Sequence, residues 1–441
     1  MINFAPLEST LGGSIIGIAA AVLLLGNGDI LGCSGIVSSL LLKPKDTFSS
    51  PTNRWKFVHI GTFLLTSSIY HFFILGEDAS SYVVPAEGTV RVPNTLAHIV
   101  GGFLVGIGTK LGNGCTSGHG ICGLARFSKR SFVAVMTFMV TGIVSGSFFD
   151  KLEIFSASDD DLSWIPNGIS TPFAISVVFL FTLGAAFILY FDDAEVRDGD
   201  TSETELRNDY YVDFGGNDIE DCTSRMKEDE ESQSTFDVLK SYSTFESSKV
   251  LDPASLGDDL KDDSGMDVIE DHISTKQDQD LQPHRNIGLR KNIFGALSGI
   301  LFALGLAISG MIKQYKVISF LDIVPIENWD PSLAFVMAGG LVISFASYQY
   351  VKDHGIISNQ RAMTCPPLLG EQCSFNVPTR TIIDAKLVIG ASLFGIGWGI
   401  AGYCPGPALY AFAAGMPKAM MYWWPSNIIG TILGELLSSY F

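Results

Sequence analysis

Long apolar segments separated by short polar loops dominate the chain. A helix needs about 20 predominantly apolar residues to cross a lipid bilayer. Nine segments are candidates for such helices, and they cover residues 12–42, 56–75, 96–111, 131–149, 172–191, 293–312, 332–351, 385–403 and 419–438. The pattern predicts an all-α polytopic membrane protein with about nine transmembrane helices.

Three of the apolar regions are interrupted by glycine. The first segment is overlong and reads Gly-Asn-Gly-Asp at residues 26–29, so we expect a broken helix with Cys33 just past the break. Residues 112–125 and 402–415 are short, rich in glycine and less apolar, which is typical of half-helices or re-entrant turns. Irregular backbone at membrane depth is tolerated only inside the protein or along a water-filled cavity. We therefore expect these breaks to lie near a central site.

The negative charge of the chain belongs to one segment. Residues 192–292 contain 28 of the 46 acidic and 11 of the 28 basic residues, which leaves 18 acidic against 17 basic residues elsewhere. The segment is rich in Asp, Glu, Ser and Thr and has little apolar periodicity, so we expect a largely disordered insertion. Its acidity therefore says nothing about a cationic substrate.

The insertion divides the chain into a first membrane half, residues 1–191, and a second membrane half, residues 293–441. Basic residues concentrate in the loops at 43–56 and 126–130, whereas acidic residues dominate the loop at 77–87. Because basic loops face the cytosol, we expect the N-terminus outside and both the insertion and the C-terminus in the cytosol. Five crossings in the first half then invert the second half relative to it, as an inverted repeat requires.

One sequence pattern occurs in both halves. Residues 104–108 read Leu-Val-Gly-Ile-Gly and residues 393–397 read Leu-Phe-Gly-Ile-Gly. After six further residues, each copy reaches a cysteine, Cys115 and Cys404. Glycine-interrupted apolar segments at corresponding positions of two halves point to the binding site of a transporter.

A shorter match brings in Cys33. Residues 31–36 read Leu-Gly-Cys-Ser-Gly-Ile, and residues 306–311 read Leu-Ala-Ile-Ser-Gly-Met. The second copy has no cysteine, so we expect an asymmetric site.

The residues around the repeated cysteines suit a soft anion. Glycine lets a ligand approach the backbone closely, and a half-helix that begins after Cys115 would direct its N–H groups and dipole at an anion. The thiol adds a soft, weak S–H donor, which suits an exposed sulphur atom better than a hard anion such as sulfate. The predicted binding and translocation residues are Cys33, Cys115, Cys404, Gly114, Gly118, His119, Lys110, Gly402 and Gly406.

Several residues have a second interpretation. Cys115, His119 and Cys122 could hold a metal, but their spacing is not a standard zinc pattern and no fourth ligand is evident. Lys110 could attract an anion or could snorkel to the membrane interface. Glu435 could belong to a proton relay, although a position at a helix end is the simpler interpretation. A lone buried cysteine is usually a small hydrophobe, the interpretation preferred for Cys122, Cys222, Cys365 and Cys373.

The two cysteine motifs are specific enough to compare with known families. Residues 112–123, Gly-Asn-Gly-Cys-Thr-Ser-Gly-His-Gly-Ile-Cys-Gly, and residues 402–408, Gly-Tyr-Cys-Pro-Gly-Pro-Ala, resemble signature stretches of the YeeE/YedE sulphur-transport family. The resemblance implies thiosulfate uptake through an hourglass-shaped inverted repeat. At its narrow centre, three thiols would pass the ion along by S–H hydrogen bonds, and the matching residues are Cys33, Cys115 and Cys404.

The resemblance also implies a setting for the protein. We expect a lipid bilayer, in particular the plasma membrane, thiosulfate or a similar sulphur-containing anion as substrate, and a cytosolic sulphurtransferase as a candidate partner. No cofactor, metal or nucleic acid is implied. The long insertion departs from the compact bacterial pattern and indicates a eukaryotic member.

Two other functional classes fit parts of the sequence. A membrane-embedded sulphur-transfer or thiol redox enzyme would use Cys115 or Cys404 as a nucleophile, but such a residue needs an exposed thiolate of low pKa. A scaffold would use the acidic insertion to recruit partners, but it would not explain the two cysteine motifs. We therefore expect a transporter and not an enzyme.

Overall fold

The computed structural model describes residues 4–76, 91–150, 154–157, 170–191, 287–324, 326, 329–357, 366, 368, 375–378 and 380–440. Apart from an isolated β-bridge between Pro93 and Ser156, the regular secondary structure of these residues is helical, which confirms the all-α prediction. The expectations for residues 192–286, and those for Cys222, Cys365 and Cys373, lie outside the described residues.

The first half alternates long and short helices. Gly28 ends α1 in a left-handed conformation (φ 74°) and Cys33 begins α2, so the predicted broken helix is present. The elements are α1 (Pro6–Asn27), α2 (Cys33–Leu42), α3 (Pro44–Ser49), α4 (Trp55–Ile69), the π-helix η1 (Tyr70–Leu75), α5 (Thr95–Leu111), the π-helix η3 (Thr116–Gly123), α6 (Lys129–Asp150) and α8 (Ser170–Phe191).

The second half repeats this order of long and short helices. Residues 287–292, assigned to the insertion by their charge pattern, form the start of its first helix. There the Lys291 ammonium lies 3.7 Å from Asp29, and the Asn27 amide donates a hydrogen bond to the Lys291 carbonyl. The elements are the helix Ile287–Ile308, α13 (Gln314–Leu321), α14 (Ser332–Ile357), α15 (Ala385–Ala401), α16 (Pro405–Ala413), the π-helix η6 (Ala419–Trp423) and α17 (Trp424–Tyr440).

Five of the described helices are long and apolar enough to cross a membrane. Two bent pairs meet the same test when each pair is taken as one span, α5 with η3 (46°) and α15 with α16 (41°). The chain is therefore an integral membrane protein, but the predicted count of nine spans is not confirmed. Among the described helices, α8 and α17 are not counted among these spans.

The helix contacts keep the same pattern when the two halves are exchanged. α1 packs on α14, and the helix Ile287–Ile308 packs on α4, where Gly295 and Gly299 meet the backbone of Trp55 and His59. α5 packs on α15, while α5 also packs on α17 and α15 on α6. This exchange is what a pseudo-two-fold axis between the halves produces.

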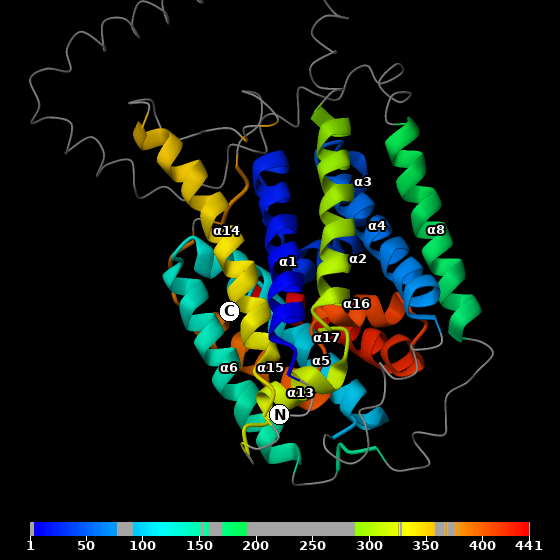
Figure 1. Cartoon of the computed structure of the whole chain (residues 1–441), viewed down its shortest axis with the longest axis vertical. Helices are drawn as coiled ribbons and strands as arrows, with labels where there is room; N and C mark the ends of the chain where they lie inside the picture. The colour runs from blue at the N-terminus through cyan, green and yellow to red at the C-terminus, as the bar shows by residue number, and fades with distance from the viewer. Residues whose placement is uncertain are drawn as a thin grey trace, which may run out of the picture. The chain divides into compact units, whose positions relative to one another are not determined.

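Corresponding helices of the two halves run in opposite directions. Gly12 near the start of α1 lies beside Gly305 near the end of the helix Ile287–Ile308. At the other end of the pair, Gly26 of α1 lies beside Phe294. The helix Ile287–Ile308, drawn in yellow-green, runs alongside α1 in Figure 1. α5 and α15 are antiparallel in the same way. The helical unit is therefore built as an inverted repeat.

The contact between α5 and α15 depends on glycine. A Cβ added at Gly108 would lie 2.4 Å from the nitrogen of Phe394, and one added at Gly390 would lie 2.2 Å from the nitrogen of Gly112. Small residues let membrane helices approach to backbone contact. Larger residues at these positions would separate α5 from α15.

We predict that Gly390→Ala destabilises the protein by roughly 1–3 kcal/mol, the usual cost of overpacking. The measurement is the thermal unfolding midpoint of the purified protein in detergent. Gly35→Ala is the matched control, because a Cβ added at Gly35 meets nothing within 4 Å. Equal midpoints for Gly390→Ala and the wild type would contradict the tight contact.

Candidate functional site

Three short helices begin at the three predicted cysteines. Cys115 is the N-cap of η3, Cys404 is the N-cap of α16, and Cys33 is the first residue of α2. None of these three helices has a side-chain cap hydrogen bond at its N-terminus. A helix N-terminus has free N–H groups and carries roughly half a positive elementary charge. The three cysteines therefore lie where the backbone favours an anion.

The turns before Cys115 and Cys404 follow from their local sequences. Gly402 ends α15 in a left-handed conformation (φ 68°), and Pro405 is the first residue of α16. Proline suits this position because its missing N–H would have no partner within the helix. In the other half, α5 ends at Leu111, and Asn113 just after it takes a φ of 56°, a conformation that Asn adopts more readily than most residues.

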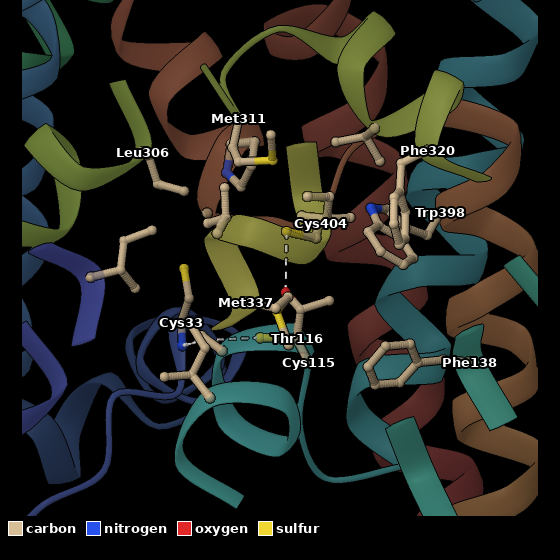
Figure 2. Close-up of a pocket in the computed structure, with 18 of the residues that line it drawn as sticks. Cys33, Cys115, Thr116, Phe138, Leu306, Met311, Phe320, Met337, Trp398 and Cys404 are labelled. Atoms are coloured by element: carbon tan, nitrogen blue, oxygen red, sulfur yellow. Dashed lines mark hydrogen bonds between the residues drawn. The ribbon is translucent and has the colours of Figure 1, made fainter. Parts of the chain in front are cut away.

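The three thiols line one cavity of about 80 Å³ (Figure 2). Cys33 and Cys115 are each 2% exposed, and Cys404 is partly buried. Gly406 also lines this cavity. Apart from Thr116 and Ser117, the rest of its wall is apolar and comes from both halves of the chain, and it includes Phe138, Met311, Phe320, Met337 and Trp398.

Two hydroxyl residues of η3, neither of them among the predicted site residues, contact the cysteines. The Thr116 hydroxyl donates a hydrogen bond to the Cys404 sulphur at 3.5 Å (Figure 2). The Ser117 hydroxyl lies 3.4 Å from the Cys115 sulphur and accepts a hydrogen bond of 3.1 Å from the backbone N–H of Cys33. Their position beside Cys115 was a usable signal, but hydroxyls in apolar segments commonly bond to their own helix.

A second cavity, of about 290 Å³, adjoins the first and is more polar. Neighbouring residues line different cavities: Cys33 the first and Ser34 the second, and Ser117 the first and Gly118 the second. At these points the two cavities lie on opposite sides of the same stretch of chain. The predicted residues found here are Lys110, Gly114, Gly118 and His119.

The second cavity carries basic side chains, some of which are paired. The Lys110 ammonium lies 2.5 Å from the Glu435 carboxylate, so each of these residues neutralises the other. Lys56 and Arg126 also line the cavity and have no carboxylate within 4.0 Å among the described residues. The cavity therefore keeps a positive character.

Asp384, the residue before α15, binds two further guanidinium groups of the second cavity. Its carboxylate lies 3.2 Å from Arg130 and 2.8 Å from Arg380. Burial raises the pKa of Asp384. The N–H of Leu387 and the two guanidinium groups together lower it by more than burial raises it, so the pKa lies below its ordinary value. Asp384 is therefore ionised at neutral pH and holds both arginines in place.

His119 connects the break after α5 with α6 through two hydrogen bonds. Its Nε2 lies 3.1 Å from the carbonyl of Gly112, and its Nδ1 lies 3.0 Å from the hydroxyl of Ser131. A carbonyl can only accept, so Nε2 carries the proton and, in the neutral ring, Nδ1 accepts from Ser131. Among the described residues, no three His, Cys, Asp or Glu side chains are arranged to hold a metal ion. The geometry of His119 is that of a positioning residue.

We predict that Gly114→Ala disturbs this arrangement, because a Cβ at Gly114 would lie 2.7 Å from the His119 ring. The expected result is a loss of roughly 1–3 kcal/mol in the free energy of unfolding. Denaturation in detergent measures it, with Gly118→Ala as the control, since the nearest atom to a Cβ there is 3.9 Å away. If both variants unfold like the wild type, His119 does not pack tightly on Gly114.

Gly402 is the one predicted residue that lines neither cavity. It ends α15, and its neighbours complete the hydrogen bonds that the break leaves open. The Gln314 amide donates to the carbonyl of Ala401, and Arg91 donates to the carbonyls of Gly399 and Ile400 at 2.9 Å each. Gly402 therefore shapes the break and does not reach the cavity.

The match between residues 31–36 and residues 306–311 is not structurally equivalent. The first segment leads into α2, whereas the second contains the end of the helix Ile287–Ile308. The equivalent breaks are instead at Gly28 and Gly310, which both take a left-handed φ of 74° and 71°. α13 is thus the counterpart of α2, and it begins at Gln314 without a cysteine.

Comparison with known proteins gives the family. Residues 6–144 match a family described as sulphur transport, and residues 291–440 match a family of unknown function (DUF6691). A probable transporter of Xylella fastidiosa (strain Temecula1) is 39% identical over 139 residues, which are 31% of this chain and 90% of that protein. Another from the same strain is 35% identical over 125 residues, 28% of this chain and 76% of that protein. No solved structure matches the chain.

An inverted repeat of helices broken around a central cavity is the architecture of a membrane transporter, and the similarity to probable transporters agrees with it. More specifically, the chain belongs to the sulphur transport family, YeeE/YedE. The family resemblance seen in the two cysteine motifs is thereby confirmed.

Proposed function

We propose that the chain imports thiosulfate, or a similar anion with an exposed sulphur atom, through the cavity lined by Cys33, Cys115 and Cys404. The observation that carries this proposal is that three helix N-termini, each bearing a thiol, converge on one buried cavity. Membership of the sulphur transport family supports a sulphur-containing substrate.

The cysteine cavity can favour an anion without a cationic side chain. Its described lining contains no Lys, Arg or His. Each of the three helix N-termini supplies roughly half a positive elementary charge, and each thiol supplies a weak S–H donor. The soft, polarizable sulphur favours a ligand whose acceptor is itself sulphur, whereas an anion with only hard oxygen atoms would be poorly matched.

The adjoining polar cavity supplies a continuation of the path. An anion that passes from the cysteine cavity into the polar cavity would meet Lys56 and Arg126 there. These two charges lie beyond the narrow centre, where they can attract the anion without needing to be desolvated inside the apolar cavity. Lys110 contributes less, because it is paired with Glu435.

The proposal includes an orientation in the plasma membrane. Basic loops face the cytosol, and Lys56, in the first turn of α4 directly after such a loop, lines the polar cavity. The polar cavity is then the cytosolic exit, and a cytosolic sulphurtransferase could receive the anion there. The N-terminus would lie outside and the C-terminus inside.

The alternative of a sulphur-transfer enzyme finds no support in the cysteine cavity. A helix N-terminus can stabilise a thiolate, but a nucleophilic cysteine is usually paired with a neighbouring base that takes its proton. The described lining contains no His, Asp, Glu, Lys or Arg. The proposal is therefore transport without covalent chemistry.

We predict that Cys115→Ala and Cys404→Ala each reduce uptake of radiolabelled thiosulfate by at least about fivefold. The physical reason is that losing an S–H donor leaves the anion under-bonded at a desolvated point, which costs roughly 1–3 kcal/mol. The assay uses cells that lack other routes for thiosulfate, with protein levels matched by immunoblot. Cys222→Ala, outside the two membrane halves, is the control and should be near neutral. Near-normal uptake by the Cys115→Ala, Cys404→Ala double variant would remove the thiols from the mechanism.

Serine at the same positions separates softness from hydrogen bonding. Cys404→Ser keeps a donor of similar size but removes the polarizable sulphur. We expect uptake of thiosulfate to remain impaired in Cys404→Ser, and transport equal to the wild type would show that any donor suffices.

The orientation is tested by labelling with a membrane-impermeant thiol reagent. Glu8→Cys, at the start of α1, should react in intact cells, whereas Ser439→Cys, at the end of α17, should react only after the cells are permeabilised. Both are made in a chain whose Cys222, Cys365 and Cys373 are replaced by serine. The opposite labelling pattern would reverse the proposed direction of the path.

A further inference from the structure

Thr116 and Ser117 are placed to control which way two thiols point. They are consecutive residues of the π-helix η3, and both line the cysteine cavity. Such π-helical segments are frequent at functional sites. Each hydroxyl lies within hydrogen-bond distance of a different cysteine sulphur, 3.5 Å for Thr116 to Cys404 and 3.4 Å for Ser117 to Cys115.

The donor in the first contact is the hydroxyl. Thr116 donates its O–H hydrogen to the sulphur of Cys404, so the sulphur is the acceptor there. A thiol has a single hydrogen, and the Cys404 hydrogen is not used in this contact. It is therefore available to a ligand in the cavity.

The second contact follows from what Ser117 already accepts. A backbone N–H can only donate, so the N–H of Cys33 uses one lone pair of the Ser117 oxygen. The Ser117 hydrogen then needs an acceptor, because a buried O–H without one loses its hydrogen bond to water. Among the described contacts of this hydroxyl, the Cys115 sulphur is the available acceptor. The Cys115 hydrogen is consequently also available to a ligand.

We infer that Thr116 and Ser117 are positioning residues that hold the thiols of Cys404 and Cys115 as hydrogen-bond donors toward the cavity. Ser117 also fixes the start of α2 through Cys33. Two thiols turned this way offer hydrogen to a ligand, and each already accepts one hydrogen bond from a hydroxyl, which favours an anionic acceptor over a donor such as a neutral thiol. The consequence for transport rests on the proposed function, whereas the orientation of the thiols can be measured without it.

The test combines infrared spectroscopy with uptake. The S–H stretching band of Cys404 is assigned in the purified protein as the band that Cys404→Ala removes. Thr116→Val keeps the shape of the side chain and removes the hydroxyl, so this band should shift, and Thr116→Ser should restore it. In proteoliposomes, Thr116→Val should raise the KM for thiosulfate roughly fivefold, the effect of about one lost hydrogen bond, and Thr116→Ser should return it toward the wild-type value.

Thr182→Val is the matched control, because Thr182 donates to the carbonyl of Val178 within its own helix, away from the cavity. It should change neither the band nor the KM. Ser117→Ala gives an independent test on the band that Cys115→Ala removes, should Thr116→Val not fold.

The outcomes separate the two proposals. An unchanged Cys404 band in folded Thr116→Val, or an unchanged Cys115 band in folded Ser117→Ala, would overturn the orientation of that thiol. An unchanged KM in a variant with a shifted band would overturn the role in selection. If the variants shift these bands but the wild-type protein transports no thiosulfate, the orientation of the thiols is supported and the proposed function is refuted.

Discussion

The need to satisfy the backbone wherever a helix breaks inside the membrane constrains the rest of this structure. A lipid environment offers no water to exposed carbonyl and N–H groups, so each break requires partners from elsewhere in the protein. At the end of α15 these partners are Arg91 and Gln314, and at the end of α5 the partner is His119. On the other side of each break, η3 and α16 begin at Cys115 and Cys404, which line the cysteine cavity. The carbonyls at the ends of the long helices are bonded by protein, and the positive ends of the short helices lie at the cavity.

The glycine contact between α5 and α15 brings the two breaks into the same site. Because the backbones touch at Gly108 and Gly390, the short helices that follow can meet, and Thr116 of η3 reaches Cys404 of α16. The inverted repeat therefore does more than duplicate a long helix followed by a short one. It places two helix N-termini from distant parts of the sequence against one cavity, and α2 adds a third with Cys33.

Much of this arrangement could be predicted from the sequence, because the signals are local. Apolar length predicts the helices, and glycine beside Cys115 and Cys404 predicts the breaks. The ion pair of Lys110 with Glu435 joins residues far apart in the chain, and no local pattern reports it. The hydroxyl contacts of Thr116 and Ser117 depend on the direction of side chains, which spacing does not determine. The match of residues 31–36 with residues 306–311 misled because small and apolar residues recur by chance in membrane helices.

The absence of a cysteine at the start of α13 has a consequence for the passage as a whole. Two identical inverted halves would present the same chemistry to both faces of the membrane, and the route would be equivalent in either direction. Here Met311, Val317 and Phe320 stand on the α13 side of the cavity, whereas the α2 side leads to a basic chamber. The two sides of the cysteine cavity therefore differ in chemistry, one apolar and the other next to a basic cavity. This difference is built into the sequence of the two halves, so the repeat is symmetric in its helices and asymmetric in its surroundings.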